Sequence, residues 1–562
     1  MQGSAGPGEP WYRNAVVYAL DVETFADADG DGVGDFSGLI DRLDYLNRLG
    51  VSAVWLLPFY PSPNRDNGYD VADYYGVDDR LGTLGDFVEF VDAADARGIR
   101  VLVDLVVNHT SDQHPWFQRA REDPDSKYRD YYVWVEEPPP PDPERGSVFP
   151  GEVEDGRVWT YDHTAGAYYY HRFYPFQPDL DLTNPAVRAE IYKILKFWLR
   201  LGVDGFRVDA ATLLIQQKHP DGEPVEDPHG ILRSLKRHAL AQRGDAVLLA
   251  EADDDPDELQ SYFGGGAEMD LLMNFVLDAH LVAALATERA EPLAAGLARL
   301  PDPDGGQWLN FLRNYDELNI GRLDADLREA VFERFAPEAD MRIYGRGIRR
   351  RLAPMLEGDR DRIELAFSLL FSLPGTPMVL YGDEIGMGED RSLPGRESVR
   401  TPMQWDDGPN AGFSTACADE LVAPIVDDED FGPDAVNVAA QRGDPDSLLN
   451  WMGRLIATRR ECPEIGHGRY RTLDVDDERV FAHAFDSGAD TVWFVHNLAA
   501  EAVTVAVPIG RDATDVTASL LESTACDWRA DDCEVSLGPY GYGWYRVRRS
   551  GAGADEGGAA PE

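Results

Sequence analysis

Basic residues are scarce in this sequence. The chain of 562 residues has 52 Lys and Arg against 102 Asp and Glu, which gives a formal net charge of -50. Such a charge repels the phosphates of nucleic acids and of anionic lipids. We therefore expect neither a nucleic acid nor a membrane among the partners of this protein.

Lysine is the scarcest of the basic residues. The lysines are Lys127, Lys193, Lys196, Lys218 and Lys236, so arginine supplies nearly all of the positive charge. Acid-rich and lysine-poor chains are typical of halophilic proteins, because strong salt screens the repulsion between surplus acids. A GC-rich genome also favours arginine over lysine, so the acidity is the stronger sign of salt adaptation.

Cysteine and long hydrophobic runs are also rare. Four cysteines are too few for a disulfide framework, and none has the spacing of zinc ligands. Cys526 and Cys533 could pair, but a reduced cytoplasm is the simpler interpretation. The first residues show no basic start followed by an apolar run, so we expect no secretory signal and a cytoplasmic protein. The longest apolar stretch, residues 365–381, is broken by Pro374 and predicts a buried helix and strand.

Eight short apolar runs are spaced along the chain, and each is followed by a stretch with helical periodicity. They cover residues 15–22, 52–58, 101–107, 203–210, 246–252, 269–275, 308–313 and 376–381. Strands that alternate with helices form either a closed parallel barrel or a doubly wound open sheet. The number of runs favours the barrel, so we predict an α/β fold built on a (β/α)8 TIM barrel.

Two segments depart from this alternation. Residues 110–183 are too long for an ordinary βα loop and are rich in aromatics, which predicts an inserted subdomain over the barrel mouth, after the third strand. We assign residues 11–109 and 184–465 to the barrel. Alternating strand patterns replace the helices over residues 466–549, which predicts a C-terminal antiparallel β-sandwich. The Gly-, Ala- and acid-rich residues 550–562 predict a disordered tail.

Charged side chains follow several predicted barrel strands, at the edge where the active sites of such barrels lie. Arg207 and Asp209 share a face of the fourth strand, so the guanidinium would keep the carboxylate ionised, as a nucleophile requires. Glu251 follows five apolar residues, and desolvation would raise its pKa, as a general acid requires. Asp316 follows the seventh strand. A lone Asp is more often a helix cap or an ion-pair partner, but acids at three strand ends indicate a catalytic site.

Short motifs in a fixed order connect this sequence to a known family. They are DLVVNH (104–109), QPDLD (177–181), GFRVDA (205–210), the strand ending at Glu251, RNYDE (313–317) and GTPMVLYGDEIGMG (375–388). With these motifs the chain resembles the α-amylase family, glycoside hydrolase family 13, over nearly its whole length. Phrases such as LPFYPSPNRDNGYDVADY and VRTPMQW are most similar to the trehalose synthase group, which isomerises maltose to trehalose. The α-glucosidases and oligo-1,6-glucosidases share many of them.

The resemblance implies a retaining mechanism on α-glucosides without an organic cofactor. Asp209 would be the nucleophile and Glu251 the general acid and later the base, while Asp316 would grip the sugar hydroxyls at positions 2 and 3. The resemblance also implies a glucose pocket formed by Tyr69, Asp70, His109, Arg207 and Arg400. Without the resemblance, an ordinary polar loop is an equally good interpretation of Tyr69 and Asp70.

One position departs from the family pattern. The family has His before the third acid, and this chain has Tyr315 there. A phenol is bulkier than an imidazole and neutral at pH 7, so it cannot supply an imidazolium beside the developing charge. We expect Tyr315 to contact the substrate, with weakened catalysis or a changed substrate as the consequence.

A Gly-rich acidic segment, DADGDGVGD, follows the first strand. Asp27, Asp29, Asp31 and Asp35, with the carbonyl of Val33, would offer several hard oxygens to one cation, as calcium loops do. A solvated acidic loop is the alternative interpretation in so acidic a chain. Because the family has a metal loop at this place, we predict a structural Ca²⁺ site far from the reacting bond.

Three functions follow as hypotheses. The first is a salt-adapted enzyme that isomerises maltose to trehalose by intramolecular glucosyl transfer, with aromatics of the inserted segment excluding water. Those aromatics are Trp116, Phe117, Tyr168, Tyr169, Tyr170, Phe173, Tyr174 and Phe176. The second is a hydrolytic α-glucosidase or α-amylase. The third is a sugar-binding relative with weak or no turnover because of Tyr315. Maltose or another α-glucoside is the expected ligand, and a homo-oligomer is an open alternative to a monomer.

Overall fold

The computed structural model is organised around a closed barrel of eight parallel strands. It describes residues 10–140, 146–149, 153, 156–488, 490–510, 516–523, 526–529 and 534–548. In spatial order, the barrel strands are β1 (Val17–Leu20), β14 (Thr376–Leu380), β10 (Gln307–Asn310), β9 (Leu271–Met273), β8 (Val247–Ala250), β7 (Gly205–Val208), β3 (Arg100–Leu105) and β2 (Ala53–Leu56). The predicted TIM barrel is thus confirmed, and each predicted strand takes part in it.

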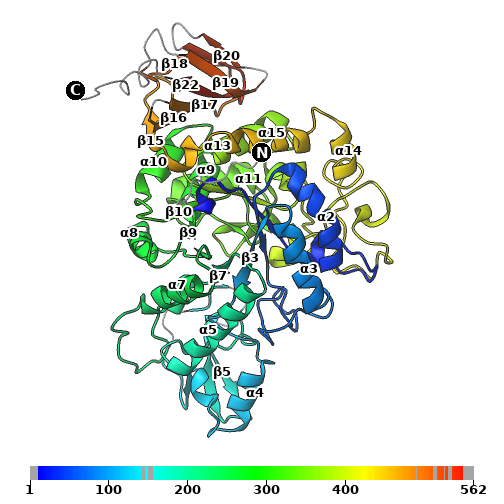
Figure 1. Cartoon of the computed structure of the whole chain (residues 1–562), viewed down its shortest axis with the longest axis vertical. Helices are drawn as coiled ribbons and strands as arrows, with labels where there is room; N and C mark the ends of the chain where they lie inside the picture. Colours follow the sequence, from blue (N-terminus) through cyan, green and yellow to red (C-terminus); the bar gives the residue numbers. More distant parts are fainter. Residues whose placement is uncertain are drawn as a thin grey trace, which may run out of the picture.

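Helices follow the barrel strands and most of them surround the barrel, whereas α4 lies below it (Figure 1). They are α1 (Val22–Phe25), α2 (Phe36–Leu49), α3 (Leu84–Asp95), α4 (Pro115–Glu122), α5 (Pro185–Arg200), α6 (Ala211–Leu214), α7 (Gly230–Gln242), α8 (Pro256–Phe263), α9 (Phe275–Thr287), α10 (Glu291–Arg299), α11 (Ala325–Phe335), α12 (Leu352–Met355), α13 (Arg360–Ser372), α14 (Val438–Gly443), α15 (Leu448–Arg460) and α16 (Glu464–His467). Local signals fix their ends. The Asp35 carboxylate accepts the N–H of Gly38 at the start of α2, and Gly50, with a φ of 95°, ends that helix.

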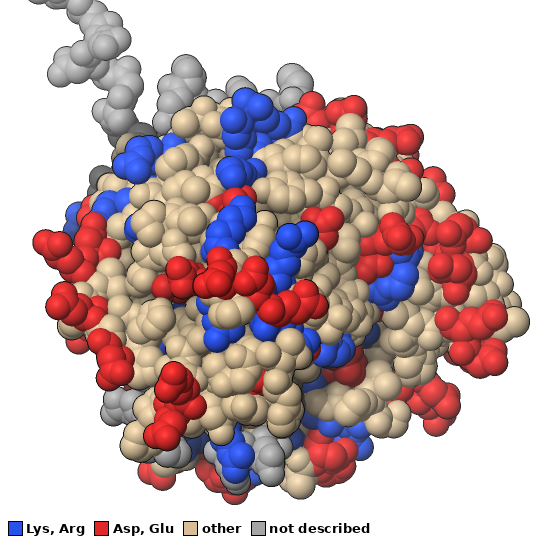
Figure 2. All heavy atoms as spheres, turned by 90° about the horizontal axis from the view of Figure 1, so that it is seen from below, with Lys and Arg blue, Asp and Glu red and all other residues tan. Residues whose placement is uncertain are grey.

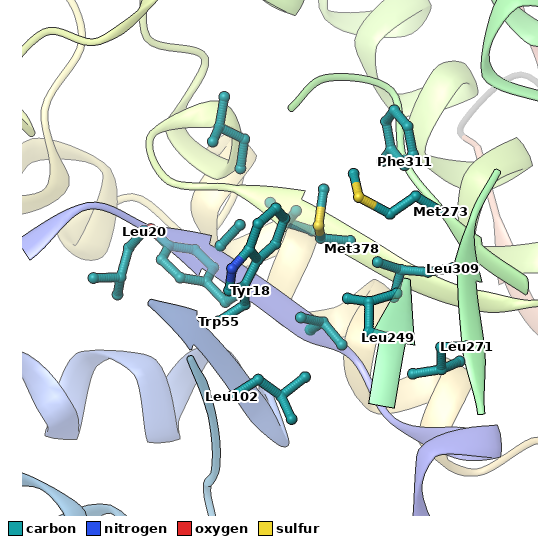
Figure 3. Packing of buried hydrophobic residues seen from close by; sticks show 14 of the residues in the cluster. Tyr18, Leu20, Trp55, Leu102, Leu249, Leu271, Met273, Leu309, Phe311 and Met378 are labelled. Carbon is teal, nitrogen blue, oxygen red and sulfur yellow. The ribbon is translucent and has the colours of Figure 1, made fainter. Parts of the chain in front are cut away.

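The barrel strands are buried on both faces. All residues of β2, β7 and β8 are buried, which explains why β2 and β8 appear in the sequence as continuous apolar runs. Tyr18, Trp55 and Leu249 are among the side chains that pack together there (Figure 3). A Cβ atom on Gly205 would lie 2.2 Å from the carbonyl oxygen of Val247, so the close approach of β7 and β8 requires glycine.

An inserted unit lies between β3 and α5, at the lower end of the molecule in Figure 1. Besides α4, it contains the antiparallel strands β4 (Trp134–Val135), β5 (Trp159–Asp162) and β6 (Ala167–Tyr170). The ring of Phe117 lies 5.5 Å from that of Trp134 and 5.0 Å from that of Tyr169. Phe117 and Tyr169, two of the aromatics predicted to cover the barrel mouth, therefore form the core of this unit instead.

Two antiparallel sheets form the opposite end of the molecule (Figure 1). Their strands are β15 (Arg469–Leu473), β16 (Val480–Ser487), β17 (Asp490–Asn497), β18 (Val503–Ala506), β19 (Val516–Glu522), β20 (Cys526–Arg529), β21 (Glu534–Leu537) and β22 (Tyr542–Arg548). Val495, Val505 and Val535 belong to one apolar cluster shared by the two sheets. The Nε1 of Trp544 donates to Ser368 Oγ on α13 over 2.8 Å, which joins the sheets to the barrel. The predicted tail, residues 550–562, lies outside the described residues.

Charged side chains cover much of the face shown in Figure 2. Acidic side chains form groups around its rim and across its centre, and basic side chains form a broken band from the top to the centre. Opposite charges are thus interspersed on this face in spite of the large net charge. Among the helices that the structure describes, none is both long enough and apolar enough to cross a bilayer.

Candidate active site

The carboxyl ends of several barrel strands lead into the wall of one cavity of about 380 Å³. Asp209 follows β7, Glu251 follows β8 and Asp316 follows β10, and all three line this cavity. Its other lining residues are Asp66, Tyr69, His109, Val148, Phe149, Arg172, Phe173, Arg207, Ala210, Thr212, Leu213, Gln216, Asp253, Asp254, Phe275, Asn314, Glu317, Asn319, Arg346 and Arg396. The barrel therefore brings the three predicted acids together although 107 residues separate the first from the last.

Arg207 on β7 is the shared partner of three carboxylates. Its Nη1 lies 2.5 Å from Asp209 Oδ1 and 2.8 Å from Asp104 Oδ1, and its Nη2 lies 2.9 Å from Glu251 Oε2. Burial alone would lower the pKa of Arg207, but Asp104 and Glu251 outweigh burial and raise it well above its ordinary value. A permanently charged guanidinium therefore compensates the buried acids around it.

Asp209 is placed to act as a nucleophile. Burial raises its pKa to about 6, against the lowering effect of Arg207. The carboxylate is therefore mostly ionised at pH 7, as nucleophilic attack requires. The next residue, Ala210, has a φ of 45°, and its N–H donates to Glu251 Oε2 over 2.9 Å. The turn that ends β7 thus orients the carboxyl group of Glu251 as well.

Glu251 is placed to carry a proton. Burial raises its pKa, Arg207 opposes this, Asp209 and Asp316 add to it, and the resulting pKa is about 7. The backbone N–H of Glu251 donates to the carbonyl of Val208 over 3.1 Å, which holds the residue at the strand end. A carboxyl group with a pKa near neutrality can both give and take a proton at pH 7, as acid–base catalysis requires.

Asp316 lies between two guanidinium groups. Its Oδ1 accepts hydrogen bonds from Arg396 Nη1 and, over 2.9 Å, from Arg400 Nη2. Burial alone would raise the pKa of Asp316, but Arg396, Arg400 and Arg207 outweigh burial and lower it. Asp316 therefore stays ionised over the pH range in which Glu251 titrates.

Two of the predicted sugar-binding residues, Tyr69 and His109, line the cavity beside Arg207. The guanidinium carbon of Arg207 lies 5.8 Å from the centroid of the Tyr69 ring. His109 Nε2 lies 3.2 Å from the carbonyl oxygen of Tyr69, and the His109 ring lies 4.9 Å from that of Phe173. Burial lowers the pKa of His109, so the imidazole is neutral at pH 7.

Three other predicted substrate residues, Asp70, Arg400 and Tyr315, are not among the residues that line this cavity. Asp70 is fully buried and bonds to its own loop, because its neighbour Tyr69 takes the position that faces the cavity. Arg400 reaches the cavity only through Asp316. Tyr315 is buried, and its hydroxyl donates to Asp21, away from the cavity. The phenol thus lies outside the wall of this cavity.

Asp66 and Arg396 are among the charged wall residues that the sequence did not predict. Arg396 Nη2 donates to Asp66 Oδ1 over 3.1 Å, and Gln177 Nε2 donates to Asp66 Oδ2 over 2.8 Å. Both residues stand close to predicted ones, Asp66 four positions before Asp70 and Arg396 four positions before Arg400. The motifs DNGYD and GRESVR each contain two candidates of the same charge type, so the motif alone could not choose between them.

The outer wall of the cavity joins two distant segments. Phe149 and Phe173 belong to the inserted unit, and the ring of Phe149 lies 5.8 Å from that of Tyr344. Arg346 Nη2 donates to the carbonyl oxygen of Val148 over 3.2 Å. Tyr344 and Arg346 lie in the turn between β12 (Arg342–Ile343) and β13 (Gly347–Ile348), which form a small sheet with β11 (Leu318–Asn319) after the seventh barrel strand.

The acidic segment after β1 brings three of its four aspartates together. Carboxylate oxygens of Asp27, Asp29 and Asp35 lie within 4.8 Å of one another. Asp31 lies outside this group, and its carboxylate accepts the N–H of Val33 over 2.9 Å. Three carboxylates at this separation suit a hard divalent cation such as Ca²⁺.

Comparison with known families identifies the catalytic part of the chain. The family described as alpha amylase, catalytic domain, matches residues 20–319 and 347–468. These ranges contain β2 to β10, β14, the last residue of β1 and the three acids of the cavity.

Similar proteins share this family. The trehalose synthase/amylase TreS of Mycobacterium tuberculosis is 43% identical over 511 residues, which are 88% of this chain and 84% of that protein. A trehalose synthase of Thermus thermophilus is 40% identical over 96% of this chain and 56% of its own length. Among solved structures, the trehalulose synthase MutB of Pseudomonas mesoacidophila matches with a TM-score of 0.78 and 28% identity, covering 96% of this chain and all of that one.

Proposed function

Since this chain belongs to the α-amylase family, we propose that it isomerises maltose to trehalose by moving a glucosyl unit within one active site. It is an enzyme of the glycosidase and transglycosidase class. Relatives that are named trehalose synthase and are 40–43% identical over most of the chain support isomerisation over hydrolysis. Hydrolases of the same family are more distant, such as an oligo-1,6-glucosidase of Parageobacillus thermoglucosidasius at 30% identity.

The observation that carries the proposal is the arrangement of acids around Arg207. Asp209, ionised at pH 7, attacks the anomeric carbon of the non-reducing glucose, and the bond from that carbon to O4 of the second glucose breaks. Glu251 gives its proton to the departing O4. The products of this half-reaction are a glucosyl ester on Asp209 and a free glucose in the cavity.

The second half-reaction forms the new bond. The retained glucose turns so that its anomeric hydroxyl faces the ester, and Glu251, now a carboxylate, takes the proton of that hydroxyl. The oxygen attacks the anomeric carbon, the ester bond to Asp209 breaks, and trehalose forms with both acids restored. Asp316, held ionised by Arg396 and Arg400, binds the hydroxyls of the glucosyl ring in both steps.

Transfer competes with hydrolysis, and the outer wall favours transfer. Water that attacked the ester would release glucose. Phe149 and Phe173 place apolar rings at the mouth, and the Arg346–Val148 hydrogen bond connects the inserted unit to the sheet of β11, β12 and β13. A wall closed in this way hinders the escape of the retained glucose and the entry of bulk water.

Product analysis tests the proposal. Purified protein is incubated with maltose at high salt, and early samples are separated by anion-exchange chromatography. We expect trehalose as the main product with glucose as a by-product, and Arg346→Ala should raise the glucose fraction. Glucose alone at early times would refute isomerisation and would favour a hydrolytic α-glucosidase, while the mechanism through Asp209 would stand.

We also propose that the three-aspartate loop binds Ca²⁺ and that the protein is adapted to high salt. The first proposal is supported by the proximity of Asp27, Asp29 and Asp35, and the second by the net charge of -50. Lowering salt from molar to 0.1 M lengthens electrostatic screening to about 10 Å, so the surplus acids should destabilise the fold. Equal melting temperatures at both salt concentrations would refute salt adaptation.

A further inference from the structure

A buried acid that the proposed reaction does not use stands behind the cavity. Asp21 follows β1, and only 6% of it is exposed. Its Oδ1 accepts the backbone N–H of Glu23 over 3.0 Å, and its Oδ2 accepts the hydroxyl of Tyr315. Neither Asp21 nor Tyr315 is part of the cavity wall, so this hydrogen bond serves something other than direct contact with a sugar.

The ring of Tyr315 supports Arg400. The guanidinium carbon of Arg400 lies 4.0 Å from the centroid of the phenol ring, and Arg400 Nε donates to the carbonyl oxygen of Tyr315 over 3.1 Å. A cation over an aromatic face is attracted by the charge distribution of the ring, so the orientation of one group depends on that of the other. The bond from the phenol to Asp21 fixes the far end of the ring and thereby the surface on which Arg400 rests.

Arg400 in turn holds Asp316. Its Nη2 lies 2.9 Å from Asp316 Oδ1, and its Nη1 lies 3.0 Å from Glu397 Oε1. Asp316 also follows Tyr315 directly in the chain, so a shift of the phenol reaches Asp316 through the backbone and through Arg400. The only member of this series that faces the cavity is Asp316.

We propose that Asp21 is a positioning residue for glucosyl transfer. It fixes Tyr315, Tyr315 supports Arg400, and Arg400 orients the carboxylate of Asp316 toward the sugar. The proposal rests on the proposed role of Asp316 in binding the glucosyl ring. A carboxylate displaced by a fraction of an ångström still binds the substrate but fits the transition state less well, so the effect falls on kcat.

Two substitutions weaken this hydrogen bond with little change in shape, because Asp21→Asn replaces the charged acceptor with a neutral amide and Tyr315→Phe removes the donor. We expect Asp21→Asn and Tyr315→Phe each to lower kcat about 10-fold and to change KM by less than 2-fold. The double variant should be about as slow as either single variant, because both break the same contact. Asp21→Glu keeps a carboxylate and should retain more of kcat than Asp21→Asn.

Tyr45→Phe is the matched control. The hydroxyl of Tyr45, on α2, donates over 2.5 Å to the buried carboxylate of Glu384, so this substitution also removes a phenol–carboxylate hydrogen bond from the barrel. Neither residue bonds to Asp316 or Arg400 in the described structure. We expect a lower melting temperature with kcat unchanged.

Turnover of maltose and of an activated aryl α-glucoside is measured for every variant, and active sites are counted by the burst of the aryl substrate. A lower melting temperature with kcat within 2-fold of the parent, as in Tyr45→Phe, would overturn the proposal. A 10-fold rise in KM at unchanged kcat would also overturn it, since Tyr315 would then contact the sugar. If either Asp21→Asn or Tyr315→Phe does not fold, the kcat of the other variant tests the proposal. Asp316→Asn tests the underlying role separately: near-normal turnover there would refute the function of Asp316 whatever Asp21 does.

Discussion

The two ends of the molecule bury polar side chains in opposite ways. At the barrel mouth, Arg207 is 2% exposed and lies within 2.9 Å of Asp104, Asp209 and Glu251. In the C-terminal sheets, His483 is fully buried, and among the described residues neither of its ring nitrogens has a hydrogen-bond partner. The mouth keeps charge in place by pairing it, whereas the sheet admits an imidazole by keeping it neutral.

The histidine of the sheet is surrounded by rings. His483 lies 4.8 Å from Phe494 and 5.2 Å from Phe481, and its other neighbour His496 bonds through Nε2 to Ser368 Oγ over 2.9 Å. Burial lowers the pKa of both histidines, that of His496 to about 3. The same burial thus raises the pKa of an acid and lowers that of an imidazole. The carboxylates at the mouth have a guanidinium that stabilises their charge, whereas the part of the chain that the structure describes gives the histidines of the sheet no carboxylate that would stabilise theirs.

Removing a charge from the mouth should have the largest effect. We expect Asp209→Asn to lower kcat for maltose by about 10⁴-fold or more, because the nucleophile is lost without a change in volume. Thermal melting checks that the fold is intact. Glu251→Gln should also be slow on maltose but partly recover on a glucoside whose leaving group needs no proton. An unchanged rate in Asp209→Asn would remove that residue from the mechanism.

The pH dependence of kcat/KM should show the two pKa values of the mouth. Asp209 must be ionised, so activity is lost as the pH falls through about 6. Glu251 must be protonated, so activity is lost as the pH rises through about 7. We expect a narrow bell with its maximum between these values and about a 10-fold fall per pH unit on each side. A rate constant that is flat from pH 5 to 9 would contradict both assignments.

A fall in pH should destabilise the C-terminal sheets. The folded protein keeps His496 neutral down to a pKa of about 3, whereas the unfolded chain takes up that proton near 6.5. The contribution of His496 to the free energy of unfolding is therefore fully present above pH 6.5 and is lost as the pH falls below that value. The loss for this residue is roughly 3 kcal/mol at pH 4.5.

The effect of His483 can be isolated by substitution. His483→Phe puts a ring that does not titrate into the same aromatic surroundings, and it should reduce the difference in unfolding free energy between pH 7 and pH 4.5. The exposed His163→Gln is the control and should leave that difference unchanged. Denaturant unfolding at pH 7 and pH 4.5 measures this difference in unfolding free energy. If the difference is the same in the parent and in His483→Phe, the protonation of His483 does not affect stability.

The smallest effect is expected from the three-aspartate loop, in which Asp29 is exposed, Asp27 half-buried and Asp35 buried. A chelator should lower the melting temperature by a few degrees, because a cation bound only to the folded state adds stability. Asp29→Asn, at an exposed position, should abolish this response. A melting temperature that is insensitive to chelator in the parent would rule out a stabilising ion.

The fold was predictable because its signals are local and repeated. Each barrel strand is an apolar run bounded by polar residues, and Glu251 and Asp209 follow such runs directly. The direction of side chains in loops was not predictable to the same degree. Asp66 and Asp70 share one loop, and only the folded backbone decides that Asp66 and Tyr69 face the cavity. The contact of Tyr315 with Asp21 joins residues 294 positions apart, and no local sequence pattern predicts it.

In the proposed mechanism, formation of the glucosyl ester changes the electrostatics that Glu251 experiences. While Asp209 is a free carboxylate, its negative charge helps to raise the pKa of Glu251. Esterification neutralises Asp209, so Arg207 loses one of its anionic partners. Its positive charge then stabilises the carboxylate of Glu251 more strongly. The pKa of Glu251 then falls, and the group that has just given away a proton stays ionised until it must take one back. The shared guanidinium thus lets one carboxyl group change from acid to base in step with the chemistry, without any movement of the chain.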